Sequence, residues 1–452
     1  MPFLSLKGRW LMASSGYHER IDYEWIKQTA KAQGVSVNEY IVLAPQNDPF
    51  YTGTPSDRAL GEWFAQVWYR MGESRAHLRR VHYYLVSLGS VVFPNGKPYE
   101  NTVECWDTLN IASKAARYLR LVDPGAFNDR RTPEVLIYAS DRRSERPSVG
   151  VYSPTYSLGM RLPDFPHLPQ YTVDGYVPVQ PYHLEVWCEK STMNDVLAPL
   201  CERYGANLQT GMGEMSITAT LALVYRLQQA GKPSRILYVS DFDPAGQSMP
   251  VAVSRKIEYF VRTLSLDLDI RLFPVVLTLD QVQAYQLPRT PIKESERRRV
   301  GFEQRHGEGA VELDALEALY PGQLEQILSG YLDCYYDWTL PERVSEQRRA
   351  LEQALEGQWQ AVMESYREEV EALREEYTRI KEEFEPRMQV MSNQLRNLWQ
   401  AVKMDLEASR PSPSDYPVPL PYAGEEIGAG LYESARDYFT QVEVYKQFQG
   451  RM

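Results

Sequence analysis

The spacing of apolar residues predicts helices towards both ends of the chain and buried strands in its middle. Apolar side chains recur at helical intervals over residues 60–71, 78–87 and 103–119, which predicts three amphipathic helices. Residues 183–188 and 236–239 are short strand-like apolar runs, as expected in a parallel sheet. Beyond residue 341 apolar positions return at steps of 3 and 4, close to the helical period of about 3.6. We therefore expect one long amphipathic helix or two stacked ones, with a kink or a hairpin break at Pro386.

The same patterns suggest how the 452 residues are organised. Three helices followed by a strand-like return at residues 135–139 indicate a winged-helix module. The two apolar runs in the middle, with a helical pattern between them, indicate an α/β domain. We expect an N-terminal extension (1–57), a winged-helix domain (58–145), a linker (146–180), an α/β domain (181–340), a helical arm (341–410), and a proline-rich linker with a terminal helix (411–452).

Composition excludes several classes of protein. No run of about 18 apolar residues occurs and the N-terminal residues lack a secretory apolar segment, so we expect a cytoplasmic protein without a membrane partner. The four cysteines are scattered, without a Cys-x-x-Cys pair, which argues against a zinc ribbon and a disulfide framework. The net charge is −11, but residues 70–146 hold 13 Lys/Arg against 9 Asp/Glu. This local surplus of +4 suits contact with a phosphate backbone.

Three carboxylates follow the predicted strands. Asp241 and Asp243 come directly after the second apolar run and precede a Pro-Ala-Gly turn, while Glu189 ends the first run. Residues two apart on a strand point to the same face, so both aspartates can reach one Mg²⁺, a cation that prefers oxygen ligands. The alternative is a solvated turn in which the aspartates cap backbone groups.

Two motifs carry a resemblance to a known family. Trp-Cys-Glu-Lys ends at Lys190, and Asp-Phe-Asp-Pro-Ala-Gly begins at Asp241, 52 residues after Glu189. They resemble the Toprim domain of the topoisomerase VI A subunit and of its meiotic double-strand-break relatives. The resemblance implies an α/β fold with a Rossmann-like parallel sheet. It also implies that Glu189, Asp241 and Asp243 hold Mg²⁺, or Mn²⁺ in its place, during DNA cleavage.

A tyrosine nucleophile is also implied by this resemblance. Arg79-Arg80-Val81-His82-Tyr83 is similar to the run that carries the nucleophile in the winged-helix domain of these families, which places Tyr83 at that position. A phenol with a pKa of about 10 is mostly neutral at pH 7, so attack on phosphate needs nearby cations. Arg79, Arg80 and a bound metal would supply them, and Lys190 would help to neutralise the phosphate. The alternative is that Tyr83 packs in a helical core.

Further basic and acidic residues have more open roles. The first set is expected to contact DNA phosphates from the winged-helix face, or to form an ordinary solvated surface: Lys114, Arg117, Arg120, Arg130 and Arg131. The second set consists of Arg297, Arg298 and Arg299, which either face DNA or belong to a solvated loop. Glu312 and Asp314 lie in Glu-Leu-Asp-Ala-Leu, a segment similar to one downstream of Toprim in the same families, and have a supporting role or a structural one.

Three functions therefore stay open. The first is a magnesium-dependent, topoisomerase-like transesterase that acts on double-stranded DNA as a homodimer and leaves protein-linked ends. The second is a hydrolytic Toprim nuclease of a plasmid or phage defence system, and the third is a DNA-binding scaffold without catalysis. No Gly-x-x-x-x-Gly-Lys-[Ser/Thr] run is present, so strand passage would need a separate ATPase, or an SMC-type partner in the defence role.

Overall fold

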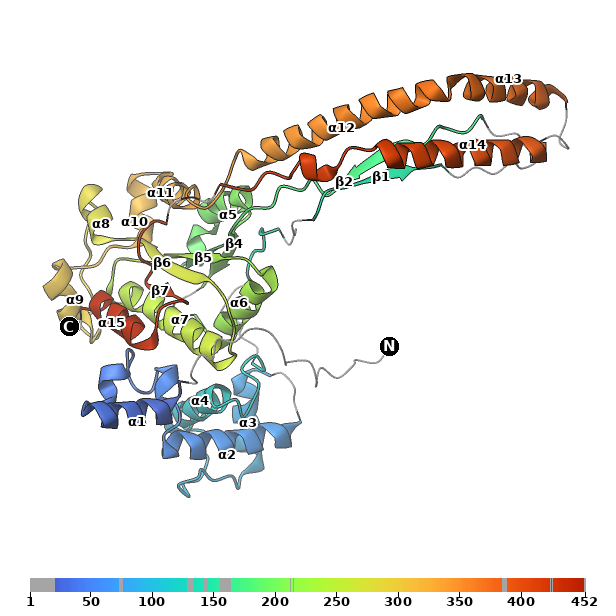
Figure 1. The fold of residues 1–452 in the computed structure, drawn as a ribbon. Coiled ribbons are helices and arrows are strands. Elements are labelled where there is room, and N and C mark those ends of the chain that lie inside the picture. Colours follow the sequence, from blue (N-terminus) through green and yellow to red (C-terminus); the bar gives the residue numbers. More distant parts are fainter. Residues whose placement is uncertain are drawn as a thin grey trace. The chain divides into compact units, whose positions relative to one another are not determined.

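The computed structural model describes residues 21–72, 76–127, 134–140, 145–154, 164–211, 213, 215–383, 388–422, 424 and 426–450. Over these residues the protein is mixed α/β, as expected (Figure 1). The chain divides into two compact units. The sheet unit comprises residues 1–139, 182–332 and 426–452, and the arm unit comprises residues 140–181 and 333–425.

The sheet unit contains five strands, in the order β4-β3-β5-β6-β7. The first four are mutually parallel and β7 runs antiparallel to β6, so the sheet is mixed. Every residue of β3, β4 and β5 is buried, which explains the apolar runs in the sequence. The strands are β3 (His183–Cys188), β4 (Asn207–Thr210), β5 (Ser234–Val239), β6 (Ile270–Val276) and β7 (Tyr432–Glu433).

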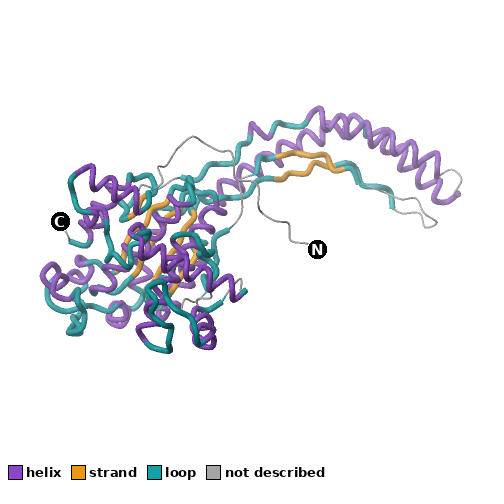
Figure 2. The backbone as a smooth tube through the Cα atoms, turned by 90° about the horizontal axis from the view of Figure 1, so that it is seen from below, coloured by secondary structure: helices purple, strands orange, loops and turns teal. Residues whose placement is uncertain are grey.

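Helices alternate with the parallel strands and cover the sheet (Figure 2). Their starts follow from local chemistry: the Ser216 hydroxyl accepts from the Ala219 N–H, and Asp243 caps the next helix. The helices between strands are α5 (Asn194–Tyr204), α6 (Ile217–Ala230) and α7 (Pro244–Thr263). After β6 come α8 (Leu279–Ala284), α9 (Arg299–His306), α10 (Leu313–Leu319) and α11 (Gln323–Leu332).

The first and the last described helices meet in the core beside α7. Segments α1 (Tyr23–Gln33) and α15 (Tyr438–Phe448) share one hydrophobic cluster with the sheet, as do the 3₁₀ turns Val37–Tyr40 and Pro49–Tyr51. Arg255 of α7 is fully buried there and forms ion pairs with Asp48 (3.3 Å) and Glu258 (3.0 Å). Its guanidinium also donates to the Tyr438 hydroxyl (2.6 Å). The predicted extension and terminal helix are thus built into the sheet unit, although the sequence predicted helix from residue 431 and the structure has β7 there.

Three helices follow in the sheet unit and match the predicted ones: α2 (Pro55–Met71), α3 (Leu78–Leu88) and α4 (Val103–Tyr118). They enclose their own hydrophobic cluster, which includes Phe64 and Leu109. The segment at residues 135–139, which the sequence predicted as a strand belonging with these helices, does not pack with them as expected. Leu136 instead exchanges two backbone hydrogen bonds of 2.8 Å with Leu208 of β4, so this segment lies at the edge of the sheet.

The arm unit is built from two strands and three helices. Strands β1 (Ser148–Tyr152) and β2 (Gln170–Asp174) pair antiparallel where the sequence predicted only a linker. Helices α12 (Leu340–Ser365) and α13 (Arg367–Glu383) lie alongside α14 (Met388–Ser409), as Figures 1 and 2 show. Pro386, where the sequence predicted a kink or a hairpin break, lies outside the described residues. No helix in the described part of the chain is both long and apolar enough to cross a membrane.

Candidate metal centre

The sheet topology brings the predicted carboxylates together. From β3 the chain passes through α5 to β4 on one side and then through α6 to β5 on the other. Ligands of open parallel sheets bind at such a switch point, beyond the carboxyl ends of the strands. Glu189 follows β3 directly and Asp241 follows β5 by two residues, so both acids lie at this point.

Glu189 has one carboxylate oxygen without a partner. Its backbone N–H donates to the Val239 carbonyl (3.2 Å), and its Oε1 accepts from the Asp241 N–H (3.0 Å). The side chain is 7% exposed, and Oε2 is buried without a hydrogen bond. Burial and the neighbouring Asp241 carboxylate raise the pKa of Glu189 to about 8. A buried orphan oxygen of this kind calls for a ligand or a proton.

Asp241 is held by groups from two other parts of the chain. Its Oδ1 accepts from the Leu313 N–H (2.7 Å), and its Oδ2 forms an ion pair with Lys190 (3.1 Å). The neighbouring Phe242 pairs antiparallel with Val311 through hydrogen bonds of 2.9 and 3.0 Å. Residues 311–313 are therefore fixed along the turn that carries Asp241.

Asp243 acts as the N-cap of α7, with Oδ1 accepting from the Gly246 N–H (2.6 Å). Capping is the structural role that the sequence left open for it. Burial, together with the charge of Asp241, raises the pKa of Asp243 above its usual 3.8. Gly246 is needed because a Cβ atom there would lie 2.1 Å from the Asp241 carbonyl oxygen.

Lys190 joins further carboxylates to this cluster. Its ammonium lies 3.2 Å from Glu312 and 2.7 Å from Asp314, besides Asp241. Burial alone would lower the pKa of Lys190, but its hydrogen bond to Asp314 and the charges of the other acids outweigh burial and raise it. The sequence placed Lys190 against a substrate phosphate, whereas the structure places it among acids. The structure also places Glu312 and Asp314 beside Lys190. Their position near Asp241 depends on the pairing of Phe242 with Val311, which sequence spacing does not reveal.

The described residues contain no group of three or more His, Cys, Asp or Glu side chains already arranged to hold a metal ion. The carboxylate oxygens of Asp241 are already bound, one by Lys190 and the other by a backbone N–H. One oxygen of Asp243 accepts a hydrogen bond from the first turn of α7. The donor set nevertheless suits a hard cation, because every ligand atom is oxygen and the Oε2 atom of Glu189 is unused.

Tyr83 lies on the solvent side of α3, not in its core. Its side chain is 63% exposed, while the preceding His82 is buried and bonds to the Tyr99 hydroxyl (2.7 Å). Arg79 and Arg80 are exposed one turn earlier, on the same side of the helix as Tyr83. Within the described residues no hydrogen bond joins Tyr83 to the acids at the switch point.

The expected DNA-contacting residues on α4 make contacts inside the protein. Lys114 donates to the Gln46 carbonyl (2.5 Å), and Arg120, just after α4, donates to the Thr263 carbonyl (3.4 Å). The guanidinium of Arg117 lies 4.6 Å from the centre of an aromatic ring. Arg130 and Arg131 lie outside the described residues.

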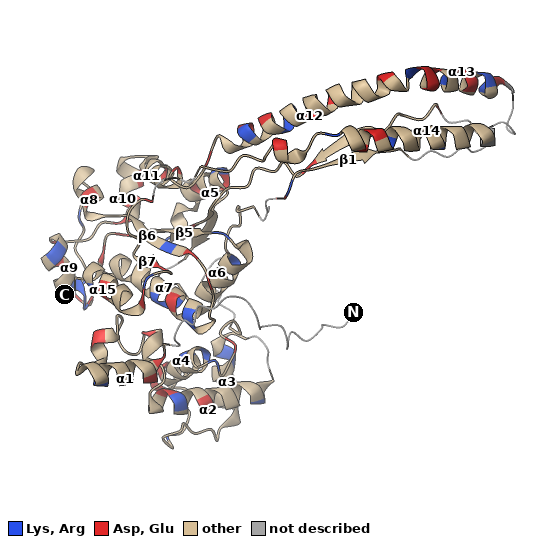
Figure 3. Ribbon diagram, in the orientation of Figure 1, with Lys and Arg blue, Asp and Glu red and all other residues tan. Residues whose placement is uncertain are grey.

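A basic cavity adjoins the candidate centre instead. It has a volume of about 330 Å³ and is lined by Pro244 and Ser248 of α7 and by Arg297, Arg298 and Arg305. Figure 3 shows this gathering of basic residues on and beside α9. The positive charge of Arg298 acts on Asp243, which places this cavity next to the acids.

No model of a known protein family matches the chain. A comparison with curated proteins finds no match either. The geometry of the site must therefore carry the functional argument.

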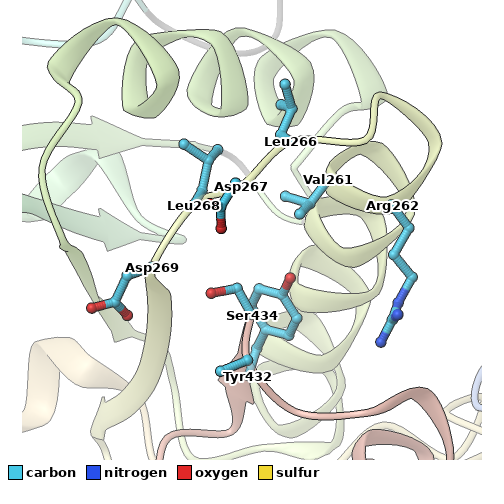
Figure 4. Close-up of a pocket in the computed structure, with 9 residues that line it drawn as sticks. Val261, Arg262, Leu266, Asp267, Leu268, Asp269, Tyr432 and Ser434 are labelled. Carbon is cyan, nitrogen blue, oxygen red and sulfur yellow. The ribbon is translucent and has the colours of Figure 1, made fainter. Parts of the chain in front are cut away.

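A second cavity lies at the opposite end of the sheet. It has a volume of about 180 Å³ and is bordered by Asp269, just before β6, and by Tyr432 and Ser434 at β7 (Figure 4). Its polar groups serve the fold, because Asp269 pairs with Arg235 (3.2 Å) and the Ser434 hydroxyl accepts from the Ile270 N–H (2.8 Å). This cavity is separate from the candidate centre.

Proposed function

We propose that the protein cleaves the phosphodiester backbone of DNA with a divalent cation, Mg²⁺ or Mn²⁺, held by Glu189, Asp241 and Asp243. The observation that carries the proposal is the unpartnered, buried Oε2 atom of Glu189 beside Asp241 at the switch point. The order of strands, helices and acids supports a Toprim domain, and helices α2, α3 and α4 stand before it in the place of the winged-helix domain, without the strand expected at residues 135–139.

Each side chain has a role in this proposal. A bound cation would neutralise charge that develops on the scissile phosphate. Glu189, Asp241 and Asp243 provide its ligands, and Asp243 also aligns α7 through its cap. The arginines of the adjoining cavity, Arg297 and Arg298, bind the neighbouring phosphates and orient the strand.

The attacking group is Tyr83 in the first form of the proposal. Its phenol is exposed, and Arg79 and Arg80 lie one turn away to stabilise the phenolate. Because no hydrogen bond among the described residues joins Tyr83 to Glu189, Asp241 or Asp243, this form of the proposal requires that Tyr83 meets the acids of a second copy in a homodimer. The same absence favours a second candidate, hydrolysis by water at the acidic centre without any tyrosine.

One experiment separates these forms. Supercoiled plasmid is incubated with Mg²⁺ or Mn²⁺ and wild type, Asp241→Asn, Tyr83→Phe or the matched control Tyr84→Phe, quenched with detergent, and run with and without protease. Transesterification gives protein-linked ends that Tyr83→Phe and Asp241→Asn abolish and Tyr84→Phe retains. Hydrolysis gives free ends that depend on Asp241 alone. DNA binding without cleavage or cation binding would refute both forms and leave a scaffold.

A further inference from the structure

The basic cavity beside the candidate centre has the size of a small-ligand site. Its volume of about 330 Å³ lies at the lower end of the range for ligand pockets, about 300–1,000 Å³. Pro244 and Ser248, from the first two turns of α7, form one wall, and α9 with the loop before it forms another. The first turn of a 20-residue helix carries partial positive charge and attracts anions. This wall favours a compact, negatively charged ligand.

Three arginines line the cavity, Arg297, Arg298 and Arg305, and none of the described residues that line it is acidic. Arg298 is fixed by Glu296, whose carboxylate accepts from it at 2.8 and 3.0 Å, and it also donates to the Ser248 hydroxyl. Within the described part of the chain, the Arg297 guanidinium has no ion pair or hydrogen bond. The wall therefore combines an arginine that is held in place with one that is available to a ligand.

The number of arginines indicates which kind of phosphate fits. A phosphomonoester carries about 1.5 to 2 negative charges at pH 7, whereas a phosphodiester inside a strand carries about one. Guanidinium groups bind phosphate oxygens through paired N–H donors. Three arginines around one cavity therefore favour a phosphomonoester over the phosphodiesters of an uncut strand.

A separate observation shows that phosphate alone does not complete the site. Gln449, directly after α15, lines the same cavity, and its Oε1 atom is buried without a hydrogen-bond partner among the described residues. A buried carbonyl oxygen of this kind calls for an N–H or O–H donor. Phosphate oxygens are chiefly acceptors at pH 7, whereas the base or the sugar of a nucleotide offers donors. The two observations together point to a nucleotide.

The cavity is joined to the candidate centre by short contacts. Pro244 follows Asp243 directly in the chain and lines the cavity. Phe302 also lines it, and its ring centre lies 5.2 Å from that of Phe242, which stands between Asp241 and Asp243. A ligand in the cavity would therefore lie beside the turn that carries the acids.

We propose that this cavity binds a nucleotide through a phosphomonoester group, with the phosphate against the three arginines and a donor of the base or sugar against Gln449. The nucleotide is either free or the 5′-phosphorylated end of a DNA strand, since both present the same chemistry. The inference goes beyond the proposed function, because binding here needs neither a cation nor cleavage. A strand end held in the cavity would lie beside the candidate centre.

The test is calorimetric titration of the full chain in a chelator, so that no strand is cut. The probes are inorganic phosphate, deoxyadenosine 5′-monophosphate, and a deoxyadenosine tetranucleotide with and without a 5′-phosphate. The 5′-phosphorylated tetranucleotide should bind about tenfold more tightly than its 5′-hydroxyl form, as expected for one added charge-assisted hydrogen bond.

Two variants and one control locate the binding. Arg297→Gln should weaken binding of both 5′-phosphorylated probes by roughly tenfold, and its exposed position makes unfolding an unlikely cause of any loss. Gln449→Met should weaken the mononucleotide by roughly fivefold and leave inorganic phosphate unchanged. The matched control is Arg299→Gln, because Arg299 pairs with Glu303 (3.0 Å) and does not line the cavity. It should change each affinity by less than about threefold.

The results also identify the source of the nucleotide. Equal affinity for the mononucleotide and the 5′-phosphorylated tetranucleotide supports a site for free nucleotides, and tighter binding of the tetranucleotide supports a site for strand ends. Equal binding of the two tetranucleotides without binding of the mononucleotide would overturn the proposal, because only internal phosphates would then be recognised. Equal losses in Arg297→Gln and Arg299→Gln would also overturn it. Either failure leaves the proposed function standing, since plasmid cleavage is measured separately.

Discussion

Gly246→Ala is a one-carbon change that tests whether the first turn of α7 sets the position of Asp241. The added Cβ would lie 2.1 Å from the Asp241 carbonyl oxygen and 3.0 Å from its carbonyl carbon. Ordinary contact begins at 3.4 Å, so the oxygen must retreat by 3.4 − 2.1 = 1.3 Å. Both neighbouring atoms belong to the backbone, which cannot yield as a flexible side chain does.

The expected effect has two parts. Alanine is favoured over glycine in a helix by about 1 kcal/mol, but forced overpacking destabilises by about 1–3 kcal/mol, so we expect a net loss of up to about 2 kcal/mol. The Asp241 N–H and carboxylate bind Glu189 and Leu313, and a shift above 1 Å breaks these contacts. A misplacement of about 1 Å typically lowers a catalysed rate by about 10²-fold. We expect a similar loss of plasmid cleavage and weaker Mn²⁺ binding.

The assay pairs urea denaturation with Mn²⁺ titration, and Gly330→Ala in α11 is the control in the same unit. A Cβ at Gly330 meets nothing within 4 Å, so this variant should gain about 0.5–1 kcal/mol and bind Mn²⁺ as wild type does. If Gly246→Ala matches Gly330→Ala in stability and in Mn²⁺ affinity, the close approach of α7 to Asp241 does not position the site.

Three other changes test the surroundings of the site. Burial would raise the pKa of Glu185, but hydrogen bonds from His183 and Arg226 outweigh burial and lower it to about 2 from the usual 4.5. The ionised Glu185 side chain therefore contributes about 3 kcal/mol to the free energy of unfolding above pH 4.5, and this contribution is lost as the pH falls towards 2. The difference in free energy of unfolding between wild type and Glu185→Gln, measured in urea titrations, should shrink over that range. Arg255→Met should destabilise the sheet unit by about 3–5 kcal/mol in denaturant unfolding, because it removes the cation that pairs with the buried Asp48 and Glu258 carboxylates; an effect below 1 kcal/mol would contradict this. Trp399→Phe should destabilise the arm unit by about 1–2 kcal/mol, since its indole N–H donates to a backbone carbonyl (3.0 Å), with intact DNA cleavage as the check that the effect is local.

Local patterns predicted the parts of the site that lie close in sequence. Asp241 and Glu189 end buried strands, and a strand that is apolar on both faces is recognisable from its own residues. The link from Asp241 to Leu313 spans 72 residues, and nothing in the alternation of residues 311–314 names its partner. The hydrogen bonds that place Glu312 and Asp314 in the site were therefore out of reach.

The same limit explains the errors in the fold. Strands β1 and β2 carry few buried side chains, so their sequences resemble a linker, and they are stabilised by pairing and by the arm helices. Strand β7 has only two residues, and its structure depends on β6. The return at Leu136 was recognisable as extended, but its partner on β4 was not. In each case the deciding contact is long-range.

Helix α7 connects the candidate centre to the segments that carry Asp48 and Tyr438. Asp243 caps its first turn, and three turns later Arg255 is held by Asp48, Glu258 and the Tyr438 hydroxyl. A helix of 20 residues with most of its length buried moves as a rigid body, so the anchor at Arg255 also limits the movement of Asp243. Residues that lie far from the acids in sequence, at positions 48 and 438, thereby help to fix where a carboxylate of the site can lie. The segments that the sequence predicted as an N-terminal extension and a terminal helix therefore help to hold the proposed cation site in position.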